Sequence, residues 1–354
     1  MDGVETCDVA IIGAGPAGAS AALELERLGL GCLIIDKAEF PREKPCAGVL
    51  PPAICATLGP LPQEVFERRV RGYFLHSVSG RQLRSRFPRP GYCVDRRVFD
   101  GWLVSRLSRL PVKGKFLNVK EDGALLRVRT DRLEVHCRVL IGADGANSSV
   151  RSFAGLPGPQ MANACQAQIP METSEITRRT DSWFHIFYII PGGYGWVAPH
   201  RDRLKVGIGS VLARKASRSA LSRFLQNPGV RELTAGTRAR DIRAHRIPMS
   251  GPLNAPGRGR ILLAGDAGGF VFPGTGEGIR YAVLSGRAAA RSAADFLDAG
   301  GAPLRLQKRY ERRLGEEGLL SLRDVDFLEV LRTPESAERY VRRLISLSRT
   351  ASSS

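Results

Sequence analysis

The chain has 354 residues, 43% of them hydrophobic, which is enough for one large core or two fused domains. Its net charge of +18 comes mainly from arginine spread along the whole sequence, and the few aromatic residues do not interleave with it, which argues against a nucleic-acid-binding protein. No long uncharged apolar run occurs, and no basic segment precedes a short one, so we expect neither a membrane span nor a signal peptide.

The seven cysteines are odd in number and form no CxxC pair, so the sequence indicates neither a metal site nor a redox dithiol. We therefore expect reduced thiols in a cytoplasmic protein. The positive charge has several interpretations. It fits an Arg-rich solvated surface, peripheral contact with an anionic membrane, attraction to a pyrophosphate-bearing substrate, or attraction to an acidic partner.

The sequence opens with the pattern of a strand, a glycine turn and a helix. Residues 8–12 are an apolar run, residues 13–18 carry three glycines, and residues 19–28 have apolar and small residues at helical spacing. A second apolar run, 32–35, ends at Asp36. This order predicts a parallel βαβ unit.

The middle of the sequence changes character. Residues 73–86 and 164–209 alternate β-branched and aromatic residues between turns marked by Gly and Pro, which predicts strands of a second, mainly antiparallel sheet. Between these two segments we expect a helix at 98–110 and short strands over 114–140.

The last third returns to the first pattern. An apolar run at 261–264 is followed by a glycine turn and a helix of small residues at 277–294. The final sixty residues read as helical, with a helix at 336–347 introduced by Thr333–Pro334 and a frayed end at 350–354.

The first glycine turn has the spacing of a dinucleotide site. Gly13 permits the tight turn, Gly15 allows a pyrophosphate to approach the backbone, and Gly18 allows close helix packing, with Ala17 inside the same turn. The helix N-terminus supplies N–H groups to phosphates. Asp36 follows about twenty residues later, where a carboxylate can bind ribose hydroxyls.

Two later turns fit FAD better than NAD. Asp144, in Gly-Ala-Asp-Gly, and Asp266, in Gly-Asp, both follow apolar strands. With the segment 94–100 (Val-Asp-Arg-Arg-Val-Phe-Asp), they resemble the hydroxylase-type FAD family, which has the fold of para-hydroxybenzoate hydroxylase. The resemblance implies that Asp266 binds the ribitol and pyrophosphate side of FAD and Arg96 its outer part.

Within that superfamily the chain resembles the geranylgeranyl reductases in three segments. Lys44-Pro-Cys-Ala-Gly48 is similar to a loop near the flavin ring, which implies contacts from Cys46, Ala47 and Gly48. The segment 265–280, with Pro273 before a glycine-rich turn, is similar to the reductase form, which implies that the backbone N–H groups of Gly278 and Ile279 face the flavin pyrimidine.

The third segment, 191–209, matches the reductases' lipid-pocket pattern PxxYxWxFPx7GxG. Ala198 departs from the pattern, because the family has phenylalanine there, and this leaves the substrate open. The resemblance implies a substrate pocket formed by Tyr194, Trp196, Pro199, Gly207 and Gly209.

The sequence therefore predicts an α/β protein with a discontinuous Rossmann-like FAD-binding domain, a second, mainly antiparallel β-sheet domain for the substrate, and a helical C-terminal region. The predicted ranges are 1–72, 91–160 and 246–295 for FAD binding, 73–90 and 161–245 for the substrate, and 296–354 for the C-terminal region.

The resemblance implies an FAD-dependent reductase that saturates carbon–carbon double bonds of an isoprenoid lipid chain. Cys46 and Tyr194 are the candidate proton donors, because thiols and phenols are protonated at neutral pH. His185 lies among aromatic residues in a strand and is expected to be a core residue. The electron donor is left open between NAD(P)H, a ferredoxin and a reduced quinol.

Two other functions compete. A flavin monooxygenase acting on an aromatic or polyketide molecule would use the same scaffold. A prenyl carrier without catalytic activity shares a related fold, but it need not retain the carboxylates of Asp36, Asp144 and Asp266, so their presence argues against it.

Overall fold

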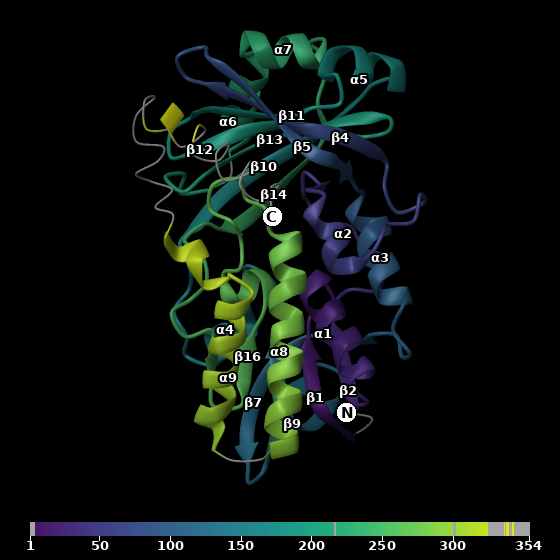
Figure 1. The fold of residues 1–354 in the computed structure, drawn as a ribbon, viewed down its shortest axis with the longest axis vertical. Helices are drawn as coiled ribbons and strands as arrows, with labels where there is room; N and C mark the ends of the chain where they lie inside the picture. Colours follow the sequence, from purple (N-terminus) through teal and green to yellow (C-terminus); the bar gives the residue numbers. More distant parts are fainter. Residues whose placement is uncertain are drawn as a thin grey trace. The chain divides into compact units, whose positions relative to one another are not determined.

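A computed structural model describes residues 4–215, 217–299, 302–324, 336, 338, 339 and 342 (Figure 1). Most of the predicted helix at 336–347 and the whole segment 350–354 lie outside the described residues. The chain divides into two compact units, the first formed by residues 1–42, 100–160 and 248–325 and the second by residues 43–99, 161–247 and 326–354.

The first unit is built on a sheet of eight described strands in which five neighbours run parallel. Their order is β16 (Ile261–Leu263), β9 (Glu134–Gly142), β1 (Val4–Ile12), β2 (Cys32–Asp36) and β6 (Val112–Lys113). Antiparallel strands extend the sheet at β9 and β16: β7 (Phe116–Asp122), β8 (Leu125–Thr130) and β15 (Gly257–Arg258). The predicted βαβ unit is confirmed, with α1 at Pro16–Arg27.

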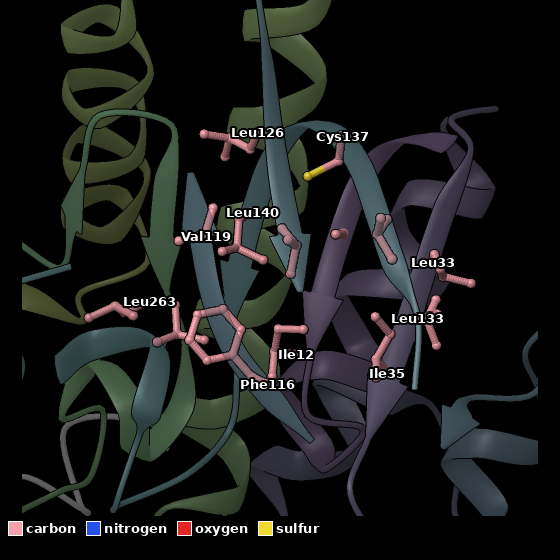
Figure 2. Packing of buried hydrophobic residues seen from close by; sticks show 14 of the residues in the cluster. Ile12, Leu33, Ile35, Phe116, Val119, Leu126, Leu133, Cys137, Leu140 and Leu263 are labelled. Atoms are coloured by element: carbon pink, nitrogen blue, oxygen red, sulfur yellow. The ribbon is translucent and has the colours of Figure 1, made fainter. Parts of the chain in front are cut away.

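Side chains from the parallel strands and from the β7–β8 hairpin form one core of the first unit. Figure 2 shows Ile12, Leu33 and Ile35 together with Phe116 and Leu126, all of which are buried. Consecutive residues of β1 and β2, such as 9–12 and 33–35, are all buried, so both faces of these strands are covered and their sequences are nearly continuous apolar runs.

The helices of the first unit follow the turns that end its strands. They are α4 (Ser149–Phe153), α8 (Ile279–Ala299), α9 (Pro303–Glu316) and the 3₁₀ segments η1 (Gly265–Gly268) and η2 (Leu320–Asp324). Helices α1 and α8 lie side by side in Figure 1, and a Cβ atom at Gly286 would lie 2.2 Å from the carbonyl oxygen of Ala17. Only glycine permits this backbone contact.

The second unit is built on another sheet of eight described strands, which is mainly antiparallel, as predicted. The exception is the parallel pair of β4 and β11. The strand order is β14 (Arg240–Pro248), β10 (Met161–Pro170), β13 (Arg203–Ser210), β12 (Gly193–Pro199), β11 (Phe184–Ile190), β4 (Arg68–Ser77), β5 (Gln82–Cys93) and β3 (Val49–Leu50).

One face of the second sheet packs against three helices, which Figure 1 shows over the strands: α5 (Thr173–Thr180), α6 (Arg218–Gln226) and α7 (Pro228–Thr234). Val197, Leu204, Val206 and Ile208 point to this face. Helix α5 interrupts the segment 164–209, which we had expected to hold strands. Its polar sequence is stabilised as a helix by ion pairs of Glu175 with arginines three and four residues later.

His185 is a core residue, as predicted. Its Nδ1 lies 3.0 Å from Nε2 of His76, and both rings stack with Phe187. Burial lowers the pKa of His185 to about 3, so the ring is neutral and unsuited to donate a proton at neutral pH.

The compact units differ from the predicted division in two respects. Residues 43–72 and 91–99 were expected in the FAD-binding domain, but they belong to the second unit, because β3, β4 and β5 pair with one another. Helix α9 was expected in a separate region. It belongs to the first unit, where the hydroxyl of Tyr310 donates to the carbonyl of Leu263 at 2.9 Å.

Helices α2 (Ala53–Leu58) and α3 (Arg96–Ser105) complete the described elements.

The contact between α1 and α8 predicts a large effect of one methyl group. Gly286→Ala should lower the free energy of unfolding by about 1–3 kcal/mol, because the added Cβ would overlap a backbone atom. The matched control is Gly315→Ala in α9, where the Cβ would meet only Leu320 at 3.8 Å and the change should be neutral or stabilising. Urea unfolding of both variants measures the difference, and equal stability would contradict this packing.

Candidate active site

In the first unit, the turn between β1 and α1 is closed by contacts that exclude side chains. Gly13 has a φ of +100°, and a Cβ atom there would lie 2.3 Å from the carbonyl oxygen of Ala143. A Cβ at Gly18 would lie 1.8 Å from the carbonyl oxygen of Gly13. Gly13 and Gly18 therefore permit the tight turn and the close helix packing that the sequence predicted.

Gly15 differs from these two glycines because space lies beside it. The only described atom within 4 Å of a Cβ placed at Gly15 is Nη2 of Arg42, at 3.3 Å. Gly15 is the N-cap of α1 and makes no side-chain cap hydrogen bond, and Pro16 follows it. An uncapped helix N-terminus beside an arginine fits a phosphate group.

Arg42 was missed by the sequence analysis. Its Nη2 lies 3.3 Å from Oδ2 of Asp100, which is fully buried, and its guanidinium lies over the ring of Phe40. These contacts hold the guanidinium near Gly15. No local motif marks Arg42, because its position depends on α3 and on the turn together.

Asp36 stands at the end of β2, as predicted, and it braces the glycine turn. Its Oδ2 accepts a hydrogen bond from the backbone N–H of Ala14 at 2.7 Å, and its Oδ1 accepts one from Ala38 at 2.8 Å. The carboxylate therefore fixes the turn itself, and its binding of ribose stays a prediction.

Asp144 lies at the turn after β9 and caps α4. It accepts hydrogen bonds from the hydroxyl of Ser148 and from the backbone N–H groups of Ser149 and Val150. Arg151 of the same helix donates to the carbonyl of Ala267 in η1. The described contacts give Asp144 a structural task, and its contact with FAD stays a prediction.

The turn from η1 to α8 brings Asp266 and Gly278 together. A Cβ placed at Gly278 would lie 3.5 Å from Oδ1 of Asp266. Ile279 begins α8 and is buried, and a Cβ at Gly265 would lie 2.9 Å from the Cβ of Ala17. The turn after β16 thus lies against the first turn of α1, as the predicted cofactor site requires.

Glu277 adds a titratable group that the sequence analysis did not single out. Its Oε1 is buried and has no hydrogen-bond partner among the described residues. Burial raises the pKa of Glu277 to about 7, while Arg280 opposes the rise. The carboxyl group is therefore about half protonated at neutral pH.

In the second unit, the loop that carries Cys46 has a fixed backbone. The N–H of Gly48 lies 3.3 Å from Sγ of Cys46 and donates to it, and the carbonyl of Gly48 accepts from Val94 at 2.8 Å. Gly48 has a φ of +73°, and a Cβ there would lie 2.2 Å from the carbonyl oxygen of Val94. Cys46 itself is half-buried.

Arg96 begins α3 and is buried, and its role in FAD binding stays a prediction.

The sheet face opposite α5, α6 and α7 carries most of the predicted substrate residues. Tyr194 and Trp196 are buried there, and their ring centroids are 6.0 Å apart. The indole N–H of Trp196 donates to Gln166 at 3.3 Å, and a Cβ at Gly207 would lie 2.2 Å from the indole ring. We call Tyr188, Tyr194, Trp196, Gly207 and Gly209 the aromatic face.

Pro199 does not belong to the aromatic face. It pairs in register with Leu204, and Leu204 lies in the core beneath the helices, because side chains alternate along a strand. Ala198 points the other way and is fully buried. The residues of the pocket pattern therefore lie on both faces of the sheet, with Tyr194 and Trp196 on one face and Pro199 on the other.

The surroundings of Tyr194 favour its neutral phenol. Burial raises the pKa of Tyr194 above its usual range, and Tyr188 and Cys46 raise it further. The phenol therefore stays protonated throughout the neutral range. Both predicted proton donors lie in the second unit.

A cavity of about 240 Å³ opens beside Gly209. Its lining is mostly apolar, and Lys215 supplies a positive charge. Its apolar lining residues include Cys165, Ile190, Pro191, Ile208, Leu212 and Ala220.

The family model for the FAD-binding domain matches residues 6–58 and 117–315. The geranylgeranyl diphosphate reductase of Rhodobacter capsulatus is 30% identical over 309 residues, which are 83% of this chain and 76% of that protein. The digeranylgeranylglycerophospholipid reductase of Methanococcus vannielii is 27% identical, over 88% of this chain and 83% of that protein.

Among solved structures, a geranylgeranyl bacteriochlorophyll reductase-like protein from Thermoplasma acidophilum has the same fold. Its TM-score is 0.78 at 24% identity, over 94% of this chain and 92% of that one. The chain belongs to the FAD-binding domain family and, within it, to the geranylgeranyl reductases, and it is an FAD-dependent oxidoreductase.

Proposed function

We propose that the protein saturates carbon–carbon double bonds of an isoprenoid chain. The observation that carries this proposal is the aromatic face of the second unit, where the rings of Tyr188, Tyr194 and Trp196 are buried against one another. An isoprenoid chain is apolar and needs such surroundings, and its reduction needs a proton donor. The names of the two reductases reported above agree with this proposal.

The first unit holds the groups that would bind FAD. The backbone at Gly15, the N-terminus of α1 and Arg42 would receive the pyrophosphate, and Asp36 and Asp266 the sugar hydroxyls. The backbone N–H groups of Gly278 and Ile279 would face the pyrimidine. Reduced FAD supplies a hydride when it is bound.

The second unit would supply the proton. An isolated alkene accepts a hydride at one carbon only if a proton reaches the other carbon. Tyr194 is neutral and therefore carries the proton, but a phenol is too weak an acid to protonate an alkene fully in a separate step. Proton transfer must accompany hydride transfer. Cys46 is the second candidate donor.

The aromatic face would also exclude water. Positive charge develops on a tertiary carbon while the proton arrives, and water would trap it. Tyr188, Tyr194 and Trp196 are each less than one tenth exposed. Ala198 stands where the family pattern has phenylalanine, so we propose that the chain length or headgroup of the substrate differs from that of the better known reductases.

The electron donor would be an acidic protein. One edge of β5 pairs with β4, and the other pairs with β3 only at Tyr92 and Cys93. Arg84, Arg86 and Arg89 are exposed along β5. This row of positive charge adds to the net charge of +18. Complementary charge accelerates the encounter of two proteins.

Gly15→Ala should separate FAD binding from folding. The added methyl group would enter the space beside the helix N-terminus, and we expect FAD to bind at least ~10-fold more weakly, a loss of about 1.4 kcal/mol. The unfolding free energy of the flavin-free protein should change by less than about 0.5 kcal/mol. Flavin titration and urea unfolding measure the two quantities, and unchanged FAD affinity would remove Gly15 from the site.

Tyr194→Phe should lower turnover of a prenyl substrate by about 10²–10⁴-fold, because it removes the hydroxyl proton and keeps the ring. FAD content should not change. Tyr188→Phe is the matched control, since it makes the same change at a neighbouring buried tyrosine and should leave turnover within a few-fold. If the Tyr194 variant keeps full turnover while Cys46→Ala loses it, the thiol is the donor instead.

Salt should slow the reaction only when a protein supplies the electrons. Turnover with a reduced ferredoxin should fall steeply between low and physiological salt, because ions screen surface charge. Turnover with a small uncharged chemical reductant is the control and should not fall. Equal salt dependence with both donors would contradict an acidic protein partner.

A further inference from the structure

A buried pair of His200 and Glu67 lies outside the residues assigned so far. His200 follows β12 directly, its side chain is fully buried, and its Nδ1 lies 2.5 Å from Oε2 of Glu67. On the other side of the ring, Nε2 lies 2.9 Å from the carbonyl oxygen of Ala47. The imidazole therefore joins the segment before β4 to the loop that carries Cys46.

The chemistry of the two contacts fixes where the protons are. A carbonyl oxygen only accepts hydrogen bonds, so Nε2 of His200 carries a hydrogen and donates it to Ala47. Nδ1 and the carboxylate oxygen of Glu67 cannot approach to 2.5 Å as two acceptors, so a second proton lies between them. The pair holds this proton together.

The charges around the pair favour an ionised carboxylate at Glu67, while burial lowers the pKa of His200 and favours a neutral ring, so the proton is shared between them. Burial would raise the pKa of Glu67, but the hydrogen bond with His200 and the charges of His200, Arg203 and Lys205 outweigh it and lower the pKa. Arg203 Nη2 lies 3.1 Å from Glu67 and 2.7 Å from Oδ2 of Asp95. The charged or titratable groups that act on the pair are Cys93 from β5, Asp95, and Arg203 and Lys205 from β13. Arg68 from β4 donates to the backbone carbonyl of His200.

The hydrogen bond to Ala47 acts on the residue next to the thiol. Val94 donates to the carbonyl of Gly48, and His200 donates to the carbonyl of Ala47. The peptide groups Ala47–Gly48 and Gly48–Val49 are therefore both held. A Cβ at Gly48 would lie 3.2 Å from Cε1 of His200, which shows how closely the ring packs on the loop. The N–H of Gly48, in turn, contacts Sγ of Cys46.

We propose that His200 and Glu67 are positioning residues, which hold the loop at Cys46–Gly48 through a shared proton and so fix the orientation of the Cys46 thiol. Neither residue is placed against the substrate. The inference concerns the geometry of the loop, and its consequence for catalysis rests on the role proposed for Cys46.

The test replaces Glu67 in two ways. In Glu67→Gln the side-chain amide can donate to Nδ1, so a neutral His200 with its hydrogen on Nε2 still donates to the carbonyl of Ala47. In Glu67→Leu no group fixes the ring. His200→Phe keeps the ring volume and removes both hydrogen bonds. The measured quantity is the rate at which iodoacetamide alkylates Cys46, divided by the rate at Cys55 in the same unit, which lies on α2 and reports general loosening.

We expect the ratio to change severalfold in Glu67→Leu and His200→Phe and to stay near the wild-type value in Glu67→Gln. An unchanged ratio in Glu67→Leu, or a Glu67→Gln variant that behaves like Glu67→Leu, overturns the inference. If His200→Phe does not fold, the two Glu67 variants decide alone.

Turnover of a prenyl substrate, measured on the same variants, separates this inference from the proposed function. A changed alkylation ratio with a lower kcat and an unchanged KM supports both. A changed ratio with full turnover in all three variants upholds the positioning role and removes Cys46 from the reaction.

Discussion

In the first unit, the backbones of two turns and of two helices touch at points where a side chain cannot fit. Gly13 meets Ala143 after β9, Gly18 meets Gly13, and Gly286 of α8 meets Ala17 of α1. These contacts bring together the ends of β1, β9 and β16, which are far apart in the sequence. Asp144 and Asp266 follow β9 and β16, and Asp36 at the end of β2 braces the turn after β1, so the predicted cofactor site depends on these backbone contacts.

Carboxylates in this unit have more than one task. Asp36 braces the glycine turn and Asp144 caps α4, so a substitution at either position would disturb the scaffold as well as any contact with FAD. Arg42 and Gly15 separate the two effects better, because space remains beside Gly15. In the second unit the two faces of the sheet have different tasks: one is packed by helices, and the other presents the buried rings of Tyr194 and Trp196.

Local patterns predicted the βαβ unit, the second sheet and the family, because glycine turns and alternating strands are written in consecutive residues. They did not predict which unit holds residues 43–72, since β4 pairs with β11 more than a hundred residues later. Arg42 and the His200–Glu67 pair were missed for the same reason: their contacts join distant segments. Glu277 was missed because its raised pKa comes from burial, which the sequence does not show. Pro199 was assigned to the pocket from the family pattern, but strand alternation puts it on the opposite face.

The central claim is that reduced flavin in this protein reduces an isoprenoid double bond. The direct measurement is anaerobic: the bound flavin is photoreduced, geranylgeranyl diphosphate is added, and flavin reoxidation and product mass are followed together. The account predicts reoxidation with a gain of two hydrogen atoms for each saturated bond. If the flavin stays reduced with every prenyl lipid but is rapidly reoxidised when oxygen and an aromatic acceptor are admitted, the protein is a monooxygenase and the account is contradicted.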